Sequence, residues 1–362
     1  MSLDVLQHFS ETYAQAREKF LRVCRGADAT MDGFKNPKKG PEGGELSTDI
    51  ACFGPRDAER LLLVMSGTHG VECMAGSSAQ IGWVASGAHA QLPPRTAVLL
   101  VHMINPYGAA WQQQETEESV NLNRNFVDPA AAFPAAPLYA QIHEAVMCPD
   151  LSGPRFDAAE AVIADYRKRE GLLGYQKALF GGQYDHPKGM NFGGHEPTWS
   201  NRTFIDILKK HASKAHKVIF LDFHTGLGPY GYASLITFCR PSDPLFARVS
   251  EWFGPTAMAV LGDETAAIAG HTGSAVTATL QNAEVTPVTV EFGTFDVERE
   301  CRVVRQDLWL RNFGDRKSEQ GRKIKHDLVS YFYPEHANWK ETVWYRGQQV
   351  IRNALDAFRN SA

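Results

Sequence analysis

The sequence lacks the usual signs of a disulfide-stapled or membrane-spanning protein. Its six cysteines are scattered singly and form no Cys-x-x-Cys pair, which favours free thiols in a reducing compartment. No apolar run approaches the roughly 18 residues of a membrane span. The N-terminus has early acidic residues and no apolar core of a secretory signal, so we expect a cytoplasmic protein.

The chain also lacks an excess of charge of either sign. The formal net charge is −4, with 37 basic and 41 acidic residues, so we expect neither nucleic acid nor a membrane surface as a partner. The hydrophobic content of 43% is ordinary for a globular protein with a sizeable core. No repeat or linker divides the chain, which predicts one domain over residues 1–362. Nothing in the sequence indicates an oligomeric state.

Short apolar runs alternate with helical patterns along most of the chain. The runs that predict buried strands are 61–66, 96–104, 217–223, 234–238 and 287–292. Helical spacing occurs at 3–25, 76–84, 201–214, 297–312, 316–330 and 340–359. This alternation predicts an α/β fold with a mainly parallel sheet and helices on both faces. Residues 26–48, rich in Gly, Pro, Lys and Asp, read as a long loop.

Residues 128–200 are less regular than the rest. They combine a Pro/Ala-rich piece, a helical pattern near 157–180 and a glycine-rich loop at 180–197. We predict an insertion into the domain at about 128–200 that covers one side of the sheet. Such long loops are usually functional, and this one would narrow the mouth of a site and favour small substrates.

Two candidate metal ligands follow the first buried apolar run. The segment LLLVMSGTHGVE (61–72) leads from that run into a glycine-flanked turn that carries His69 and Glu72. A zinc site needs an imidazole nitrogen and a carboxylate oxygen about 2 Å from one cation. The same spacing at His8 and Glu11 falls in a predicted helix and carries no such meaning, so it is the strand and the glycines that favour a metal at His69.

Other polar residues stand at the ends of later strands, where ligands bind in α/β sheets. His224 ends KVIFLDFH and would complete a His-Glu-His set with one open position, as in catalytic zinc sites. Asp222 either orients an imidazole from behind or is a solvated strand-end carboxylate. Glu291, in VTVEFG, is either paired with an arginine or is the general base that takes a proton from metal-activated water.

The run NLNRNF (121–126) surrounds Arg124 with amide side chains. A guanidinium is a planar fork that suits a carboxylate. Arg124 therefore either grips an acidic end of the substrate or ties a loop together.

Taken together, these motifs resemble the zinc carboxypeptidase superfamily, which includes carboxypeptidase A and the succinylglutamate desuccinylase/aspartoacylase group. The sequence is most similar to a bacterial carboxypeptidase-like branch related to that group. The motifs that carry the resemblance are SGTHGVE at 66–72, NPYG at 105–108, NLNRNF at 121–126, DFHTGLGPYG at 222–231, VEFGT at 290–294, and FYP followed by Trp339-Lys340.

The resemblance implies a three-layer α/β/α fold with a central mixed, mainly parallel sheet. It also implies a single zinc ion bound by His69, Glu72 and His224, with Glu291 as the catalytic glutamate. Asn123 and Arg124 match the pair that binds the terminal carboxylate of the substrate. Tyr230 or Tyr232, in the turn after His224, is a further candidate for a substrate contact.

One departure from the family concerns an arginine that polarises the scissile carbonyl. Gln113 or Gln114 stands at its place here, and a glutamine donates a hydrogen bond without charge. The site is therefore modified but active, or has lost activity, or takes an arginine from elsewhere. The candidates for that arginine are Arg155, Arg202 and Arg240.

The leading prediction is a zinc-dependent hydrolase that cleaves an amide bond next to a free carboxylate, in a small peptide or an N-acyl amino acid. The alternative is a non-catalytic zinc protein that binds a carboxylate ligand. A plain α/β domain with coincidental histidines is the third reading.

Overall fold

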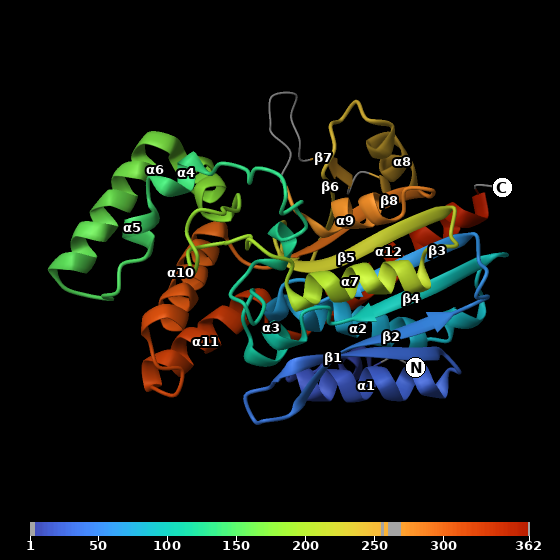
Figure 1. The fold of residues 1–362 in the computed structure, drawn as a ribbon. Coiled ribbons are helices and arrows are strands. Elements are labelled where there is room, and N and C mark those ends of the chain that lie inside the picture. Colours follow the sequence, from blue (N-terminus) through green and yellow to red (C-terminus); the bar gives the residue numbers. More distant parts are fainter. Residues whose placement is uncertain (1–3, 255–256, 260–268, 361–362) are drawn as a thin grey trace.

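The computed structural model describes residues 4–254, 257–259 and 269–360; the remaining parts of the predicted domain, both ends included, lie outside the described residues. One eight-stranded sheet crosses the described molecule in the order β1-β2-β4-β3-β5-β8-β6-β7 (Figure 1). Its strands are β1 (Thr30–Lys39), β2 (Glu45–Phe53), β3 (Arg60–Ser66), β4 (Thr96–His102), β5 (Lys217–Gly226), β6 (Ala233–Thr237), β7 (Ala257–Ala259) and β8 (Glu284–Gly293).

The centre of the sheet is parallel and its flanks are mixed. β3 pairs in parallel with β4 and β5, and β5 pairs in parallel with β8. β2 and β6 join this core in antiparallel fashion. The central strands are almost wholly buried, as expected where helices cover both faces of a parallel sheet.

Helices cover the sheet on both sides, which confirms the predicted three-layer α/β/α class. On one face α1, α2, α8 and α12 enclose a core that includes Phe20, Trp83 and Ile351. On the other, α7 and α9 pack Phe204 and Val276 against the strands. No helix in the described ranges is both long and apolar enough to cross a membrane. The helices of these two layers are α1 (Tyr13–Gly26), α2 (Cys73–Ala85), α7 (Trp199–His211), α8 (Pro244–Phe253), α9 (Thr272–Thr279) and α12 (Ala337–Asn360).

Residues 128–200, predicted to be an insertion and called the insertion below, contribute three helices to a lobe and do not cover one face of the sheet. These helices pack against α10 and α11 around a separate core that includes Tyr139, Tyr166, Leu308 and Phe332. Figure 1 shows this lobe to the left of the sheet. The expectation that the insertion covers one side of the sheet is therefore wrong. The helices of the lobe are α4 (Pro137–Ala140), α5 (His143–Val146), α6 (Pro154–Phe180), α10 (Val297–Phe313) and α11 (Glu319–Phe332).

The prediction of a long loop at 26–48 is also wrong, because β1 and β2 form an antiparallel hairpin there. β1 lies at the edge of the sheet, and its residues are mostly exposed. Edge strands carry lysine, polar residues and even proline, so their composition imitates that of a loop. The N-terminal helix is likewise shorter than expected, because α1 begins only at Tyr13, capped by Thr12.

Candidate metal centre

The turn after β3 places His69 and Glu72 at the carboxyl end of the sheet. Gly67 has a φ of 76°, and a short 3-10 helix, η2, spans Gly70–Glu72. A Cβ atom at Gly70 would lie 1.9 Å from the carbonyl carbon of Gly108, at the start of α3 (Pro106–Trp111), so only glycine fits there. The close approach of these two backbones fixes the path of the turn.

The other site residues come from the two strands next to β3 on one side. β5 lies beside β3 and carries Asp222 and His224. Glu291 is the partner of His224 in the ladder between β5 and β8. Because paired residues on neighbouring strands point to the same face, His224 and Glu291 project toward the same region as the turn.

Three of the predicted site residues converge on one point. One ligand atom from each of His69, Glu72 and His224 lies within 4.8 Å of the others, and no other group of three such residues does so in the described chain. His69 Nδ1 lies 2.9 Å from Glu72 Oε1, and His224 Nδ1 lies 3.1 Å from Glu72 Oε2. The donors are two imidazole nitrogens and one carboxylate, a set that suits zinc with an open position.

The electrostatics of this group are those of closely coupled charges. Burial opposes ionisation of Glu72, but His69 and His224 bring the pKa of this carboxyl down to about 2. Burial alone would lower the pKa of His224, yet Asp222 and Glu72 raise it well above its usual value. The carboxylate of Glu72 is therefore ionised and ready to bind a cation.

Asp222 supports His224 from behind. Its Oδ2 lies 3.0 Å from His224 Nε2, close enough for an ion pair although not aligned as a hydrogen bond. The same carboxylate accepts hydrogen bonds from Thr68 Oγ1 at 2.8 Å and Thr272 Oγ1 at 2.7 Å. Asp222 is fully buried, which excludes the alternative of a solvated strand-end residue.

Glu291 is buried beside the group of His69, Glu72 and His224 (the cluster), and one of its oxygens has no hydrogen-bond partner. Its Oε2 has no hydrogen-bond partner among the described residues, and no arginine or lysine there pairs with it. Burial, together with the charges of Glu72 and Glu300, raises the pKa of Glu291 to about 8. The alternative of an arginine-paired carboxylate is therefore excluded, and the free oxygen can accept or hold a proton.

Asn123 and Arg124 lie on a 3-10 turn, η4 (Leu122–Arg124), and both are engaged with the protein. Asn123 Oδ1 accepts a hydrogen bond from Thr272 N at 3.0 Å. Arg124 donates to the carbonyl oxygens of Asn123, Phe180 and Gly181 at 2.7, 2.7 and 3.2 Å. Arg124 thus ties the insertion to the turn, and its role as a substrate contact stays a prediction.

The other predicted contacts have partners away from the cluster. Gln113 donates to the carbonyls of Glu115 and Thr116 and accepts from Arg316 Nη2 at 2.6 Å, so its amide is held by its own loop and by Arg316. The Tyr230 hydroxyl lies 2.7 Å from His336 Nδ1 at an exposed position. Their roles as substrate contacts stay predictions.

The three candidates for a replacement arginine lie on the surface, and none has a hydrogen bond to His69, Glu72, His224 or Glu291 in the described residues. Arg155, Arg202 and Arg240 are all exposed. In the described chain, no arginine forms a hydrogen bond with His69, Glu72, His224 or Glu291.

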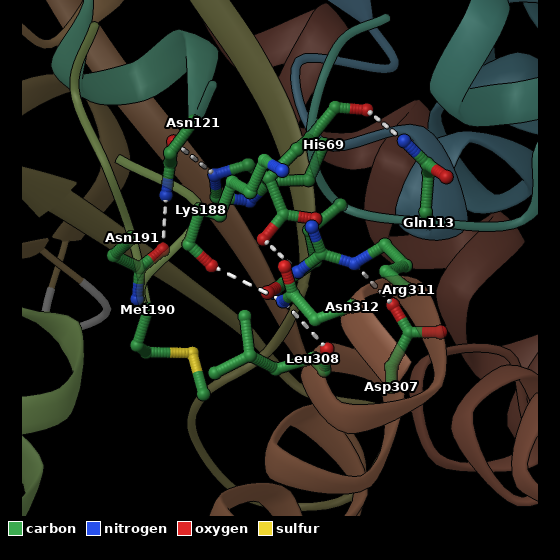
Figure 2. Close-up of polar contacts among 12 residues, drawn as sticks. His69, Gln113, Asn121, Lys188, Met190, Asn191, Asp307, Leu308, Arg311 and Asn312 are labelled. Carbon is green, nitrogen blue, oxygen red and sulfur yellow. Dashed lines mark hydrogen bonds and ion pairs between the residues drawn. The ribbon is translucent and has the colours of Figure 1, made fainter. Parts of the chain in front are cut away.

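Two supports of the site were not foreseen from the sequence. Figure 2 shows His69 linked to Asn121, which is linked in turn to Asn191 of the insertion. It also shows the largely buried Arg311 beside Asp307, and Arg311 binds Glu115, in the loop that packs against the turn. Asn121 could have been suspected from the NLNRNF run, but nothing marked Asn191 or Arg311, since their partners are distant in sequence.

Comparisons with solved structures find similar chains at low sequence identity. The chain is similar to bovine thrombin-activatable fibrinolysis inhibitor in complex with tick carboxypeptidase inhibitor (10% identity over 98% of this chain and 99% of that chain, TM-score 0.49). It is similar to carboxypeptidase A from Helicoverpa armigera (12% identity, 97% and 75%, TM-score 0.49). It is also similar to the succinylglutamate desuccinylase from Chromobacterium violaceum (14% identity, 88% and 74%, TM-score 0.38).

No curated protein sequence matches the chain. A family model described as "Protein of unknown function (DUF2817)" matches residues 9–346, which include every residue of the candidate metal centre. The chain belongs to this family.

Proposed function

We propose that the protein is a zinc-dependent hydrolase that cleaves an amide bond next to a free carboxylate. One observation carries the proposal. The ligand atoms of His69, Glu72 and His224 converge within 4.8 Å, on the side of the sheet to which Glu291 also projects. A metal site with an adjacent, unpartnered carboxylate is the arrangement that hydrolysis of an amide requires.

The three ligands would hold one zinc ion through His69 Nδ1, a Glu72 oxygen and His224 Nδ1. When bound, zinc supplies Lewis acidity, which polarises a carbonyl and makes water a stronger acid. Glu72 contributes the one negative charge of the set, while Asp222 supports the orientation of His224.

Glu291 would move the proton. Its Oε2 lies buried without a partner, so it can take a proton from the attacking water and pass it to the leaving amide nitrogen. The raised pKa of this carboxyl, about 8 in the metal-free protein, suits a group that must hold a proton between the two steps.

Arg124 and Asn123 would receive the carboxylate of the substrate. Each Nη of an arginine carries two hydrogens, and each Nη of Arg124 uses one of them on a backbone carbonyl. One N–H on each nitrogen remains for a bidentate contact with a carboxylate. The substrate class is accordingly a small peptide or an N-acyl amino acid.

The test is hydrolysis by the zinc-loaded chain of short peptides and N-acyl amino acids, compared with the Glu291→Gln variant. We expect the variant to bind zinc normally and to lose about 10²–10⁴-fold in kcat, since general-base catalysis supplies about that much. Full activity in Glu291→Gln would refute the assigned role, and a folded, zinc-loaded wild type that hydrolyses neither substrate class would refute the function.

The second candidate is a zinc protein that binds a carboxylate ligand without turnover. The absence of any arginine contact to the cluster in the described residues favours it, because a charged donor to the oxyanion is then missing. It predicts saturable ligand binding without hydrolysis, in the wild type and in Gln113→Arg alike.

A further inference from the structure

The second nitrogen of His69 is held by a chain of two asparagines that ends in the insertion. His69 Nε2 lies 3.1 Å from Asn121 Oδ1, and Asn121 Nδ2 donates to Asn191 Oδ1. Asn191 Nδ2 in turn donates to the carbonyl oxygen of Leu179 at 3.0 Å, in the last turn of α6. Figure 2 shows the part of this chain from His69 to Asn191.

Backbone groups at both ends of this series of hydrogen bonds fix the direction of each bond in it. The backbone N–H of Asn123 can only donate, and it donates to Asn121 Oδ1 at 2.9 Å, so an oxygen must stand there. The Leu179 carbonyl can only accept, so the nitrogen of the Asn191 amide must face it. Neither amide can therefore be turned over without breaking a bond to the backbone.

The direction of these hydrogen bonds determines that Nε2 of His69 carries a hydrogen. Because Asn121 Oδ1 is an acceptor, His69 Nε2 must carry a hydrogen and donate it. A metal bound at Nδ1 would then take the lone pair of the neutral ring there, on the nitrogen that faces Glu72 at 2.9 Å. The asparagines thus select the tautomer that a metal at Nδ1 needs.

The two histidines of the site are supported by different parts of the chain. The partner behind His224 is Asp222, two residues away on the same strand. The partners behind His69 lie outside its own turn, and the second of them belongs to the insertion. The hydrogen bonds from His69 to Asn121, from Asn121 to Asn191 and from Asn191 to the Leu179 carbonyl are buried or nearly so, which keeps water from replacing them.

We propose that Asn191 is a positioning residue of the metal centre: through Asn121, the insertion sets the tautomer and the ring orientation of His69. The inference rests on the zinc site of the proposed function and deepens it. It makes zinc affinity depend on a residue of the insertion, 122 positions beyond the ligand that it supports.

The experiment measures the zinc dissociation constant of the full chain by competition with a chelating dye. Asn191 has a φ of 50°, so Asn191→Gly removes the side chain without adding backbone strain. We expect this variant to bind zinc about 10–100-fold more weakly, the usual loss when a residue behind a metal-bound histidine is removed. Asn191→Asp keeps the acceptor for Asn121 and should recover part of the affinity.

Asn125→Ala is the matched control. Asn125 also ties the insertion to the 121–126 run, through the carbonyls of Gly193 and Glu196 at 2.8 and 3.0 Å, but its side chain has no hydrogen bond to Asn121 or His69. Its zinc affinity should stay near that of the wild type, while thermal unfolding reports the loss of stability in both variants. Equal zinc affinities in wild type and Asn191→Gly, or an equal loss in Asn125→Ala, would overturn the proposal.

A second measurement does not depend on any variant. Nitrogen-15 spectra of the histidines in the zinc-loaded wild type should show His69 with its hydrogen on Nε2 and the metal on Nδ1. A hydrogen on Nδ1 would overturn the inference. The proposed function fails differently, by absence of hydrolysis in a protein whose zinc affinity and His69 tautomer are as expected.

Discussion

Two sets of buried carboxylates lie near the turn that carries His69 and Glu72, and the two sets differ in whether a basic side chain pairs with them. Glu115 and Asp307 share Arg311, which lies 2.7 Å from Glu115 Oε1 and 3.1 Å from Asp307 Oδ2. Lys325 also pairs with Asp307. Glu291 and Glu300, by contrast, have no arginine or lysine partner among the described residues, and burial raises the pKa of each to about 8.

This difference separates support from chemistry. The paired carboxylates hold the loop whose carbonyls, at Gln113 and Gln114, accept hydrogen bonds from Val71 N and Gly70 N of the metal turn. A buried carboxylate without an arginine or lysine partner is costly, so a fold retains one where it is used. We infer that the paired set stabilises the turn and that the unpaired set serves the reaction or its surroundings.

Removal of Arg311 should produce the largest change in stability. Arg311→Leu removes the cation that pairs with Glu115 and one of the two that pair with Asp307, in a buried site. We expect a loss of about 3–5 kcal/mol in the free energy of unfolding, measured in urea. The matched control is Arg305→Leu on the same helix, whose partner Glu160 lies 2.5 Å away and is partly exposed, so that variant should lose far less. Equal losses would show that the buried network is not special.

Glu300→Gln should give a pH-dependent effect of opposite sign. The folded pKa of Glu300 lies near 8 because of burial and the charge of Glu72, above its ordinary 4.5. The wild type therefore loses stability from this group as the pH rises from about 4.5 to 8, whereas the glutamine variant does not. We expect the stability of the variant relative to the wild type to rise by up to about 4 kcal/mol across this window in metal-free protein. A constant difference between pH 5 and 8 would contradict the unpaired state of Glu300.

The sequence sufficed for the parts of the site that follow from local patterns. Buried strands and the residues at their ends are visible in apolar runs, so His69, Glu72, His224 and Glu291 could be named in advance, and their convergence follows from the parallel order of β3, β5 and β8. The fold class was predictable for the same reason. The proposed roles of these residues in zinc binding and catalysis stay predictions.

Contacts between distant segments could not be read from the sequence. Arg311 meets Glu115 across 196 positions, and Asn191 meets Asn121 across 70. No local sequence pattern marks these residues, because a buried arginine or asparagine cannot be told from an exposed one by residue type. The β1–β2 hairpin was missed for a related reason, because its polar edge strand has the composition of a loop.

One zinc ion between His69, Glu72 and His224 is the centre of the proposed function. X-ray absorption at the zinc edge, combined with a zinc-loaded crystal structure, measures this without any assumption about the substrate. We expect His69 Nδ1 and His224 Nδ1 at about 2.0–2.1 Å from the zinc ion, and an oxygen of Glu72 at about 2.0–2.2 Å from it. Zinc bound by other residues, or a folded protein that takes up no zinc at these three side chains, would contradict it.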